Sequence, residues 1–235
     1  MTRRRWIADR VEGERAYLLA GNADHLARVL RAKPGQQFDI SAEGEVRLGT
    51  IVSITPEEVE FALGPLVKSK SLPEIETHVV LSIFKFDRLE WAIEKLTELG
   101  VARIIPAVAR RTEPHLAKAA EKRVERWRKI AHEAAQQSRR PAAPEIRDPS
   151  PLKKAILEAA GQCVVLSEME ETATLMSVLE SGRSPITLAL GPEGGWAAEE
   201  LKIFQESGWQ PGSLGPTILR AETAAIAAVA IAMAK

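Results

Sequence analysis

Cysteine is almost missing from the sequence, in which Cys163 is the single example. One cysteine excludes an intramolecular disulfide and a zinc site built from several cysteines. Cys163 stands in a short apolar run, so a small core residue is expected there. Long apolar runs are also missing, because no segment reaches the roughly 18 residues that predict a membrane span. The basic residues 3–5 have no apolar stretch behind them, which argues against a signal peptide and favours a cytoplasmic protein.

Metal-binding and nucleotide-binding motifs are missing as well. The sequence has no His-Glu-x-x-His pattern, no Cys/His cluster and no carboxylate triplet, so no metal is expected. His78, His115 and His132 are scattered, and each is expected at the surface or at the edge of a core. The glycine-bearing stretch 191–195 lacks the Gly-Lys-Ser/Thr ending of a P-loop. It also differs from the G-x-G-x-x-G dinucleotide pattern.

Net charge is zero over the 235 residues, but the charges are unevenly distributed. Residues 1–33 hold eight Lys/Arg against four Asp/Glu, and residues 110–147 hold eleven against five, which gives +4 and +6. Local basic patches of this kind bind phosphates even in a neutral protein. Solvated helices also carry many charges, and charge alone does not decide between these two readings.

The first 70 residues predict a small β-domain, because short strand-like segments alternate with turn residues. The segments are Trp6–Ala8, Ala16–Leu19, Gln37–Ile40, Val46–Ile54 and Val59–Leu63. One helix is expected over Asp24–Ala32, where His25, Arg28 and Arg31 would share neighbouring faces. Those three side chains would contact one nucleic-acid backbone while Leu26, Val29 and Leu30 pack inward; the alternative is an ordinary charged surface helix. Residues 64–76 are expected to be a linker.

From Thr77 onward, strands alternate with helices, which predicts an α/β fold with a mostly parallel sheet. The strands are expected at Val79–Phe84, Val101–Val108, Cys163–Leu166 and Ile186–Leu190. The first helix is expected to begin at Asp87, its N-cap, and to end at Gly100. Further helices are expected over residues 116–139, 151–160, 172–181, 197–207 and 221–235. The domains are therefore residues 1–70 and 71–235.

Two glycine-bearing stretches near the end of the chain follow short apolar approaches. The first, Gly191–Trp196, comes between the expected strand Ile186–Leu190 and the helix Ala197–Ser207. A strand, a glycine loop and a helix present backbone N–H groups at the carboxyl end of a sheet. The second stretch, Leu214–Leu219, comes before a helix that is apolar on almost every side. Each loop by itself is equally consistent with a tight turn, but two so close in sequence suggest one pocket with two walls.

The amino-acid sequences of these two loops resemble the motifs of a known family. Gly-Pro-Glu-Gly-Gly-Trp at 191–196 and Leu-Gly-Pro-Thr-Ile-Leu-Arg-Ala-Glu-Thr-Ala at 214–224 resemble the closing motifs of the ribosomal RNA small subunit methyltransferase E family, of the SPOUT class. Residues 25–31, 95–101 and 133–138 resemble further motifs of that family. The resemblance implies a PUA-like RNA-binding β-barrel, a parallel-sheet domain with a C-terminal trefoil knot, and the cofactor S-adenosyl-L-methionine. It also implies methylation of N3 of one uridine in 16S ribosomal RNA.

Site residues follow from the resemblance and from the polar groups near the expected pocket. Cofactor binding is expected at Leu166, Leu190, Gly191, Glu193, Gly195, Leu214, Gly215, Ile218 and Leu219. Arg220 would stabilise a developing uridine anion, and Glu222 would orient Arg220 or relay a proton. The alternative role for Glu222 is to cap the last helix. RNA contacts are expected at His25, Arg28, Arg31, Arg110 and Arg139, with Arg111 and Arg140 as further candidates.

The apolar helix expected over Ala221–Lys235 needs more cover than one sheet face gives, which predicts a homodimer. The alternative is a monomer in which the helix that begins at Asp87 covers the whole exposed apolar stripe of this last helix. Two other functions also remain open at this point. One is a SPOUT transferase that methylates a tRNA ribose 2′-hydroxyl, and the other is a non-catalytic RNA-binding assembly factor.

Overall fold

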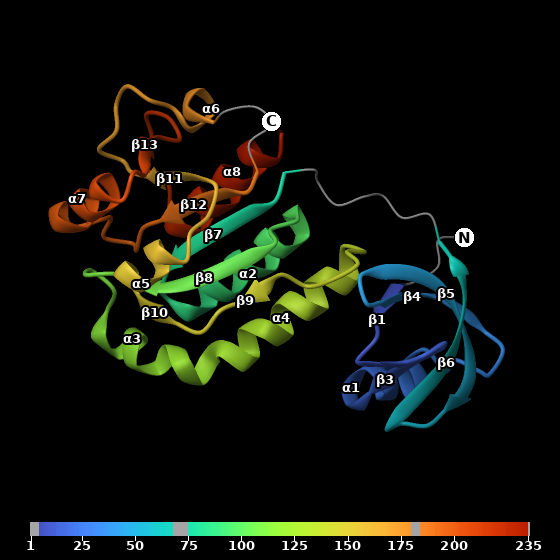
Figure 1. Cartoon of the computed structure of the whole chain (residues 1–235). Coiled ribbons are helices and arrows are strands. Elements are labelled where there is room, and N and C mark those ends of the chain that lie inside the picture. The colour runs from blue at the N-terminus through green and yellow to red at the C-terminus, as the bar shows by residue number, and fades with distance from the viewer. Residues whose placement is uncertain (1–4, 68–74, 180–183, 235) are drawn as a thin grey trace. The chain divides into compact units, whose positions relative to one another are not determined.

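The computed structural model describes residues 5–67, 75–179 and 184–234, which form two compact units (Figure 1). The first unit holds the N-terminal strands together with residues 135–142, and the second holds the rest. Of the expected linker, residues 64–66 belong to a strand of the first unit, and residues 68–74 lie outside the described part. None of the helices in the described ranges is long and apolar enough to cross a membrane.

The first unit is a curled six-stranded sheet with order β1-β4-β5-β6-β3-β2. Its elements are β1 (Arg5–Ile7), β2 (Arg10–Glu12), β3 (Arg15–Leu19), α1 (Ala20–Asp24), a π-helical turn η1 (His25–Val29), β4 (Gln37–Ala42), β5 (Glu45–Ile54) and β6 (Glu58–Leu66). Among the described strands of this unit, the β1–β4 pair is parallel and the other pairs are antiparallel. Ala8 and Asp9 alone separate β1 at one edge from β2 at the other, so the two edges of the curled sheet lie close together.

The core of this unit follows from period-two alternation along the strands. In β6, Val59, Phe61 and Leu63 are buried, whereas the residues between them are only partly covered. Trp6 and Leu26 complete the same core. Burial of these apolar side chains is the main stabilising contribution to a small sheet of this kind.

The expected helix Asp24–Ala32 is confirmed only in part, because its bounds and its type differ. The chain becomes helical at Ala20, and residues 25–29 form a π-helical turn. Arg31 lies beyond that turn with φ of 50°, so it does not share a helical face with His25 and Arg28. Leu26 is buried as expected, but Val29 and Leu30 are exposed.

The second unit is a seven-stranded parallel sheet with order β10-β8-β7-β12-β11-β13, and β9 also pairs with β8. Its strands are β7 (Thr77–Ser82), β8 (Arg103–Val108), β9 (Glu145–Ile146), β10 (Ser150–Pro151), β11 (Gln162–Leu166), β12 (Ile186–Leu190) and β13 (Gln210–Gly212). Its helices are α2 (Phe86–Leu99), α3 (Pro114–Ala120), the 3-10 turn η2 (Glu121–Arg123), α4 (Val124–Gln137), α5 (Leu152–Leu157), α6 (Leu175–Val178), α7 (Ala198–Glu206) and α8 (Ala221–Met233).

Helices cover both faces of this sheet, which is the α/β architecture that the alternating pattern predicts. In β7, Val79 and Leu81 point to the face covered by α2, α4 and α8, and Val80 points to the face covered by α5 and α7. Both faces are apolar, so the central strands read as continuous hydrophobic runs.

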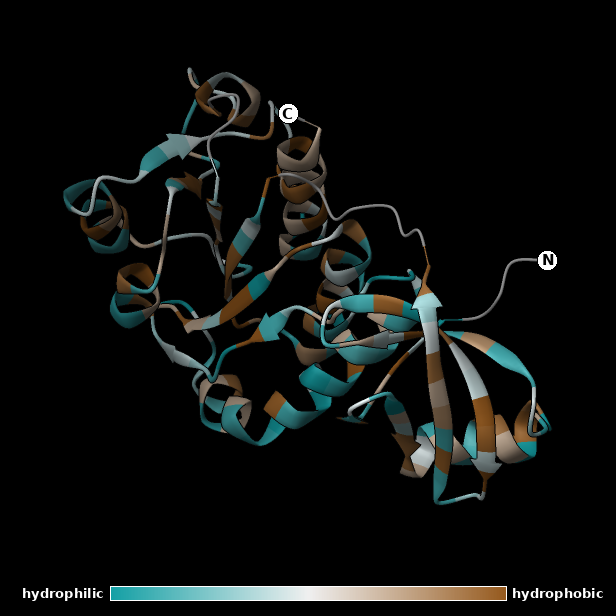
Figure 2. Ribbon diagram, turned by 45° about the vertical axis from the view of Figure 1, so that its right-hand side comes forward, coloured by the Kyte–Doolittle hydropathy of each residue, from teal (hydrophilic) through white to brown (hydrophobic). Residues whose placement is uncertain are grey.

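Helix α8 is the most apolar element of the chain, with hydrophobic colours along most of its length in Figure 2. Ala225, Ala228, Val229 and Ala232 are buried where α8 packs against α2, β7 and β12. Thr223 and Ala230, on the opposite side, are exposed. Helix α2 therefore covers one face of α8 and leaves a stripe of small residues uncovered within the single chain.

Several details of the second unit differ from the expectations. Asp87 lies inside α2, whose N-cap is Lys85, although Gly100 ends the helix in the left-handed region as expected. Gln210–Gly212, which has the composition of a turn, forms the edge strand β13. The helix expected over residues 116–139 begins at Pro114 and is interrupted by η2. Of the helix expected over 172–181, α6 is the part observed, and residues 180 and 181 lie outside the described residues.

Candidate active site

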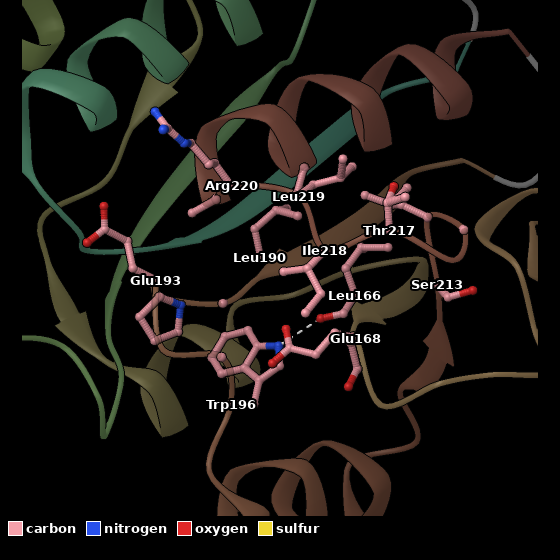
Figure 3. A pocket seen from close by; sticks show the side chains of 18 of the residues that line it. Leu166, Glu168, Leu190, Glu193, Trp196, Ser213, Thr217, Ile218, Leu219 and Arg220 are labelled. Atoms are coloured by element: carbon pink, nitrogen blue, oxygen red, sulfur yellow. Dashed lines mark hydrogen bonds between the residues drawn. The ribbon is translucent and has the colours of Figure 1, made fainter.

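One cavity of about 380 Å³ lies where the strands β11, β12 and β13 end. Because these strands are parallel, their carboxyl ends lie at the same edge of the sheet. The cavity is lined by the end of β11 and the residues after it, by the first glycine loop (residues 191–196) and by the second glycine loop (residues 214–219). The two loops expected to form one pocket therefore do lie together (Figure 3).

The first glycine loop is anchored by Trp196. The indole Nε1 of Trp196 donates a hydrogen bond of 2.9 Å to the carbonyl of Leu166, at the end of the neighbouring strand β11 (Figure 3). The same ring packs edge-on against Phe204 of α7 at 4.9 Å between centroids. A Cβ on Gly191 would approach the Trp196 ring to 3.3 Å, so a larger residue would crowd this contact.

Gly195 allows the turn of the same loop. Its N–H donates to the Pro192 carbonyl at 2.8 Å, and its φ of 70° lies in the left-handed region that favours glycine. A Cβ at this position would stand 2.4 Å from Oε1 of Glu168. The backbone of Gly195 therefore borders the cavity where no side chain fits without displacing Glu168.

The second glycine loop leads directly into α8. Gly215 has φ of 110°, and Ile218 is 86% exposed although it lines the cavity. Arg220 is the N-cap residue of α8 and also lines the cavity. All nine residues expected to bind a cofactor, from Leu166 to Leu219, line this one cavity.

The charged groups at one end of the cavity form an arrangement that differs from the expected one. Arg88 Nη1 donates to Glu193 Oε1 at 2.6 Å, and Arg88 Nε lies 3.9 Å from Glu222 Oε1. Glu222 is buried, and its Oε2 has no hydrogen-bond partner among the described residues. Arg220 is exposed and makes no ion pair with any residue in the described part of the chain. The arginine beside Glu222 is thus Arg88 rather than Arg220.

Glu222 does not cap α8 through its side chain. The N-cap position belongs to Arg220, which makes no side-chain capping bond, and Glu222 lies in the first turn of the helix. A carboxylate in the first turn interacts favourably with the positive end of the helix dipole. That favourable interaction and the nearby guanidinium of Arg88 together offset part of the cost of burying a carboxylate.

Two charged residues that line the cavity, Arg88 and Glu168, were not expected from the sequence. Arg88 lies in the first turn of α2, a few residues beyond the end of β7, and Glu168 follows the end of β11 by two residues. Both belong to the type of position that the parallel-sheet rule singles out, namely polar residues just past the carboxyl ends of strands. That rule could have found them once the strands were placed.

The residues expected to contact RNA do not form one cluster. The ring of His25 packs against Trp6 at 5.8 Å, whereas Arg28 is exposed and paired with Asp24 at 2.7 Å. Arg31 is exposed beyond the π-helical turn.

Arg110 and Arg139 occupy different elements. Arg110 is exposed just after β8, and its N–H donates to buried Glu200 at 2.7 Å. Arg139 is exposed, and its carbonyl accepts a hydrogen bond from Arg5 within the first unit. Arg140, a further candidate, is buried; burial lowers the pKa of its guanidinium to about 10, so it does not offer a surface contact to phosphate.

Among the described residues, no group of three or more His, Cys, Asp or Glu side chains could hold a metal ion.

Comparison with known protein families assigns both units. An RNA methyltransferase domain matches residues 70–233, and an RNA methyltransferase PUA domain matches residues 20–63. The ribosomal RNA small subunit methyltransferase E of Bacillus subtilis is 32% identical over 217 residues, which cover 87% of this chain and 84% of the relative. The protein of the same name from Aquifex aeolicus is 28% identical and covers 94% of this chain and 95% of its own length.

Solved structures with the same fold include two that contain a bound ligand. A methyltransferase of Legionella pneumophila, in complex with the cofactor S-adenosylmethionine, is 26% identical with a TM-score of 0.86 over 100% of this chain and 98% of that one. A ribosomal RNA small subunit methyltransferase E of Neisseria gonorrhoeae, bound to S-adenosyl methionine, has a TM-score of 0.85 over 97% and 95% of the two chains. At 24% identity the second shows the shared fold.

The parallel sheet with its glycine-loop cavity and the PUA domain together define the class of RNA methyltransferases that carry a PUA domain. The match to named relatives over most of the chain is more specific. The chain belongs to the ribosomal RNA small subunit methyltransferase E family, a family of S-adenosylmethionine-dependent enzymes that act on ribosomal RNA.

Proposed function

We propose that this protein transfers a methyl group from S-adenosylmethionine to N3 of one uridine in the 16S RNA of the small ribosomal subunit. The observation that supports this most strongly is a single cavity with two glycine-loop walls and with Arg220 at one end. Family membership supports ribosomal RNA as the substrate class. The choice of uridine N3 depends on the resemblance of the closing motifs.

The shape of the cavity fits a cofactor of this kind. Its volume of about 380 Å³ lies within the range of small-molecule sites, and leucine and isoleucine side chains alternate with bare glycine backbone along its walls. We assign cofactor binding to Leu166, Leu190, Gly191, Glu193, Gly195, Leu214, Gly215, Ile218 and Leu219. When bound, the cofactor supplies an electrophilic methyl group. The side chain of Glu193 already accepts a hydrogen bond from Arg88, so we propose that Glu193 supports cofactor binding by holding the first glycine loop in place.

At the end of the cavity where the transfer takes place, the protein must accept the N3 proton of uridine and stabilise the negative charge that develops on the uracil ring. N3 of uridine carries a proton, so the ring becomes more negative as that proton leaves. Arg220 is suited to stabilise the uracil carbonyl oxygens, because it lines the cavity and has no acidic partner within the described chain. Arg88 is less suited, since Glu193 and Glu222 already surround it.

Glu222 has two parts in the proposal. Its Oε1 lies 3.9 Å from Arg88 Nε and partly balances the charge of that guanidinium, which lines the cavity, whereas Glu222 itself is buried and does not line the cavity. Its Oε2 has no hydrogen-bond partner in the described part of the chain, which leaves one oxygen able to accept the proton in a relay.

RNA recognition is assigned to both units. N3 lies on the Watson–Crick edge, so the target uridine must be unpaired or flipped out when it reacts. We propose that residues 1–70 recruit RNA and that residues 71–235 carry out the transfer, which agrees with the PUA and methyltransferase domains found there. Exposed Arg28, Arg31, Arg110 and Arg139 are proposed to contact phosphates. His25 is proposed to contact RNA as well, from a ring that packs on Trp6 at 5.8 Å between centroids.

A knot and a dimer complete the proposal. The chain runs out to β13 at the sheet edge and then returns to place α8 against β7 and β12, which is the kind of return that a trefoil knot requires. The uncovered stripe of α8, with Thr223 and Ala230, consists of small residues that allow a second copy to approach closely. A two-fold dimer would cover that stripe on both copies at once.

Nucleoside analysis tests the proposed reaction. Small ribosomal subunits or 16S RNA from cells without the protein would be incubated with the purified protein and S-adenosylmethionine, and then digested for mass spectrometry. The proposal expects 3-methyluridine at a single position. A 2′-O-methylated nucleoside in tRNA would support the ribose alternative instead. RNA binding without any methylation would support the assembly-factor alternative.

A further inference from the structure

Glu168 is a carboxylate in the cavity that the proposed reaction does not use. It lines the cavity just past the end of β11, and it is exposed. No hydrogen bond or ion pair joins its carboxylate to another residue of the described chain. The other two nearby acids differ, because Glu193 and Glu222 both face Arg88. Glu168 is therefore available to a ligand in a way that they are not.

This carboxylate lies against a glycine of the first glycine loop. Oε1 of Glu168 lies 2.4 Å from the point where a Cβ on Gly195 would stand, so the side chain rests against the bare backbone of the first glycine loop. Figure 3 shows the carboxylate beside Trp196, well away from the guanidinium of Arg220. It therefore lies at the part of the cavity remote from the reacting end.

Two neighbouring hydroxyl groups are the ligand chemistry that this position favours. A carboxylate has two oxygens that only accept, and it can take one hydrogen bond from each hydroxyl of a cis-diol. Such charge-assisted bonds are stronger than neutral ones. In dinucleotide-binding sheets, an acidic residue near the carboxyl end of a strand likewise binds a ribose hydroxyl. A positively charged sulfonium would need to lie near Arg220 instead, where the transfer takes place.

We propose that Glu168 is a specificity-determining residue of the cofactor site, whose carboxylate accepts hydrogen bonds from the two ribose hydroxyls of the adenosyl group. This inference rests on the proposed function, because it takes the cavity to be the S-adenosylmethionine site. It adds a carboxylate contact to an assigned cofactor-binding set that otherwise consists of leucine, isoleucine and glycine residues and of Glu193, whose side chain is held by Arg88.

Calorimetry with matched ligands tests the inference. S-adenosylhomocysteine, its 2′,3′-dideoxy analogue and S-adenosylmethionine would be titrated into the wild-type protein, Glu168→Ala and Glu171→Ala. Glu171 is an exposed acid of the same segment that does not line the cavity, so its variant controls for the change in charge. Thermal denaturation of each variant would check that the fold is intact.

We expect the loss of the Glu168 carboxylate and the loss of the ribose hydroxyls to be strongly coupled, as in a double-mutant cycle in which one change is made in the protein and the other in the ligand. The wild type and Glu171→Ala should bind S-adenosylhomocysteine on the order of tenfold to a hundredfold more tightly than the dideoxy analogue, as lost charged hydrogen bonds imply. Glu168→Ala should bind both alike, and it should lose the same factor for S-adenosylmethionine.

A folded Glu168→Ala protein that still prefers the diol would overturn the inference. A loss confined to S-adenosylmethionine would also overturn it, because Glu168 would then contact the sulfonium. If the wild type binds none of the three ligands, the proposed function itself is wrong, and this outcome is distinct from the other two.

Discussion

The substitution Gly195→Ala separates the shape of the cavity from the stability of the fold. Gly195 has φ of 70°, and alanine in the left-handed region costs about 1–2 kcal/mol. For a protein of this size, that cost lowers Tm by roughly 2–8 °C. The fold should survive, because native proteins are stable by about 5–15 kcal/mol.

The cofactor site should suffer more than the fold. The new methyl group would stand 2.4 Å from Glu168 Oε1, whereas ordinary van der Waals contact begins at 3.4 Å, so the carboxylate must move by about 1 Å or more. The methyl group and the displaced carboxylate would both intrude into the space where the cofactor is proposed to bind. We expect S-adenosylmethionine to bind at least tenfold more weakly, which corresponds to about 1.4 kcal/mol.

Gly208→Ala is the matched control. Gly208 has φ of 77°, but a Cβ there meets nothing within 4 Å. It should therefore show the same loss of Tm by calorimetric scanning and the same cofactor affinity as the wild type by titration. The reasoning would be refuted if both variants bound the cofactor as the wild type does, or if both lost affinity equally.

Three further predictions concern turnover, RNA and assembly. Arg220→Ala should reduce the single-turnover rate by at least tenfold with little change in cofactor affinity, because Arg220 acts on the transition state; a near-normal rate would remove it from the catalytic residues. Replacing Arg28 and Arg31 together by alanine should weaken RNA binding and reduce its salt dependence, and an unchanged salt slope would make them solvated charges only. Light scattering at low micromolar concentration should give twice the 25.7 kDa of one chain, whereas 25.7 kDa itself would contradict the dimer.

Much of the second unit could be predicted because its signals are strong and local. The strand Ile186–Leu190 matches β12, and the strand expected over 163–166 differs from β11 by one residue, since continuous apolar runs mark strands buried on both faces. Gly100 ends α2 because its left-handed φ of 106° suits glycine. The edge strand β13 was not predicted, because Gln210-Pro211-Gly212 has the composition of a turn and pairs only through its position beside β11.

The helix of the first unit shows the opposite case. The periodicity of residues 24–32 resembles an amphipathic helix, but the packing of the ring of His25 on Trp6 and the positive φ of Arg31 depend on the surrounding sheet. Tertiary contacts of this kind have no local signal in the sequence.

Site residues that belong to contiguous sequence motifs could be predicted, whereas residues that only the fold brings together could not. Both glycine loops and Arg220 come from contiguous stretches, and the structure places them around one cavity. Arg88 lies more than 100 residues before Glu193, so no local pattern connects the two. Glu222 was paired with Arg220 because they are neighbours in sequence, whereas its neighbour in space is Arg88.

The most direct measurement of the central claim is the methylated nucleoside itself. Small-subunit RNA from cells that lack the protein would be treated with purified protein and S-adenosylmethionine, then digested and analysed by mass spectrometry, with Arg220→Ala as the matched inactive variant. The account predicts one 3-methyluridine per RNA with the wild-type protein and a strongly reduced yield with the variant. A methyl group on a ribose, on another base, or at no position at all would contradict it.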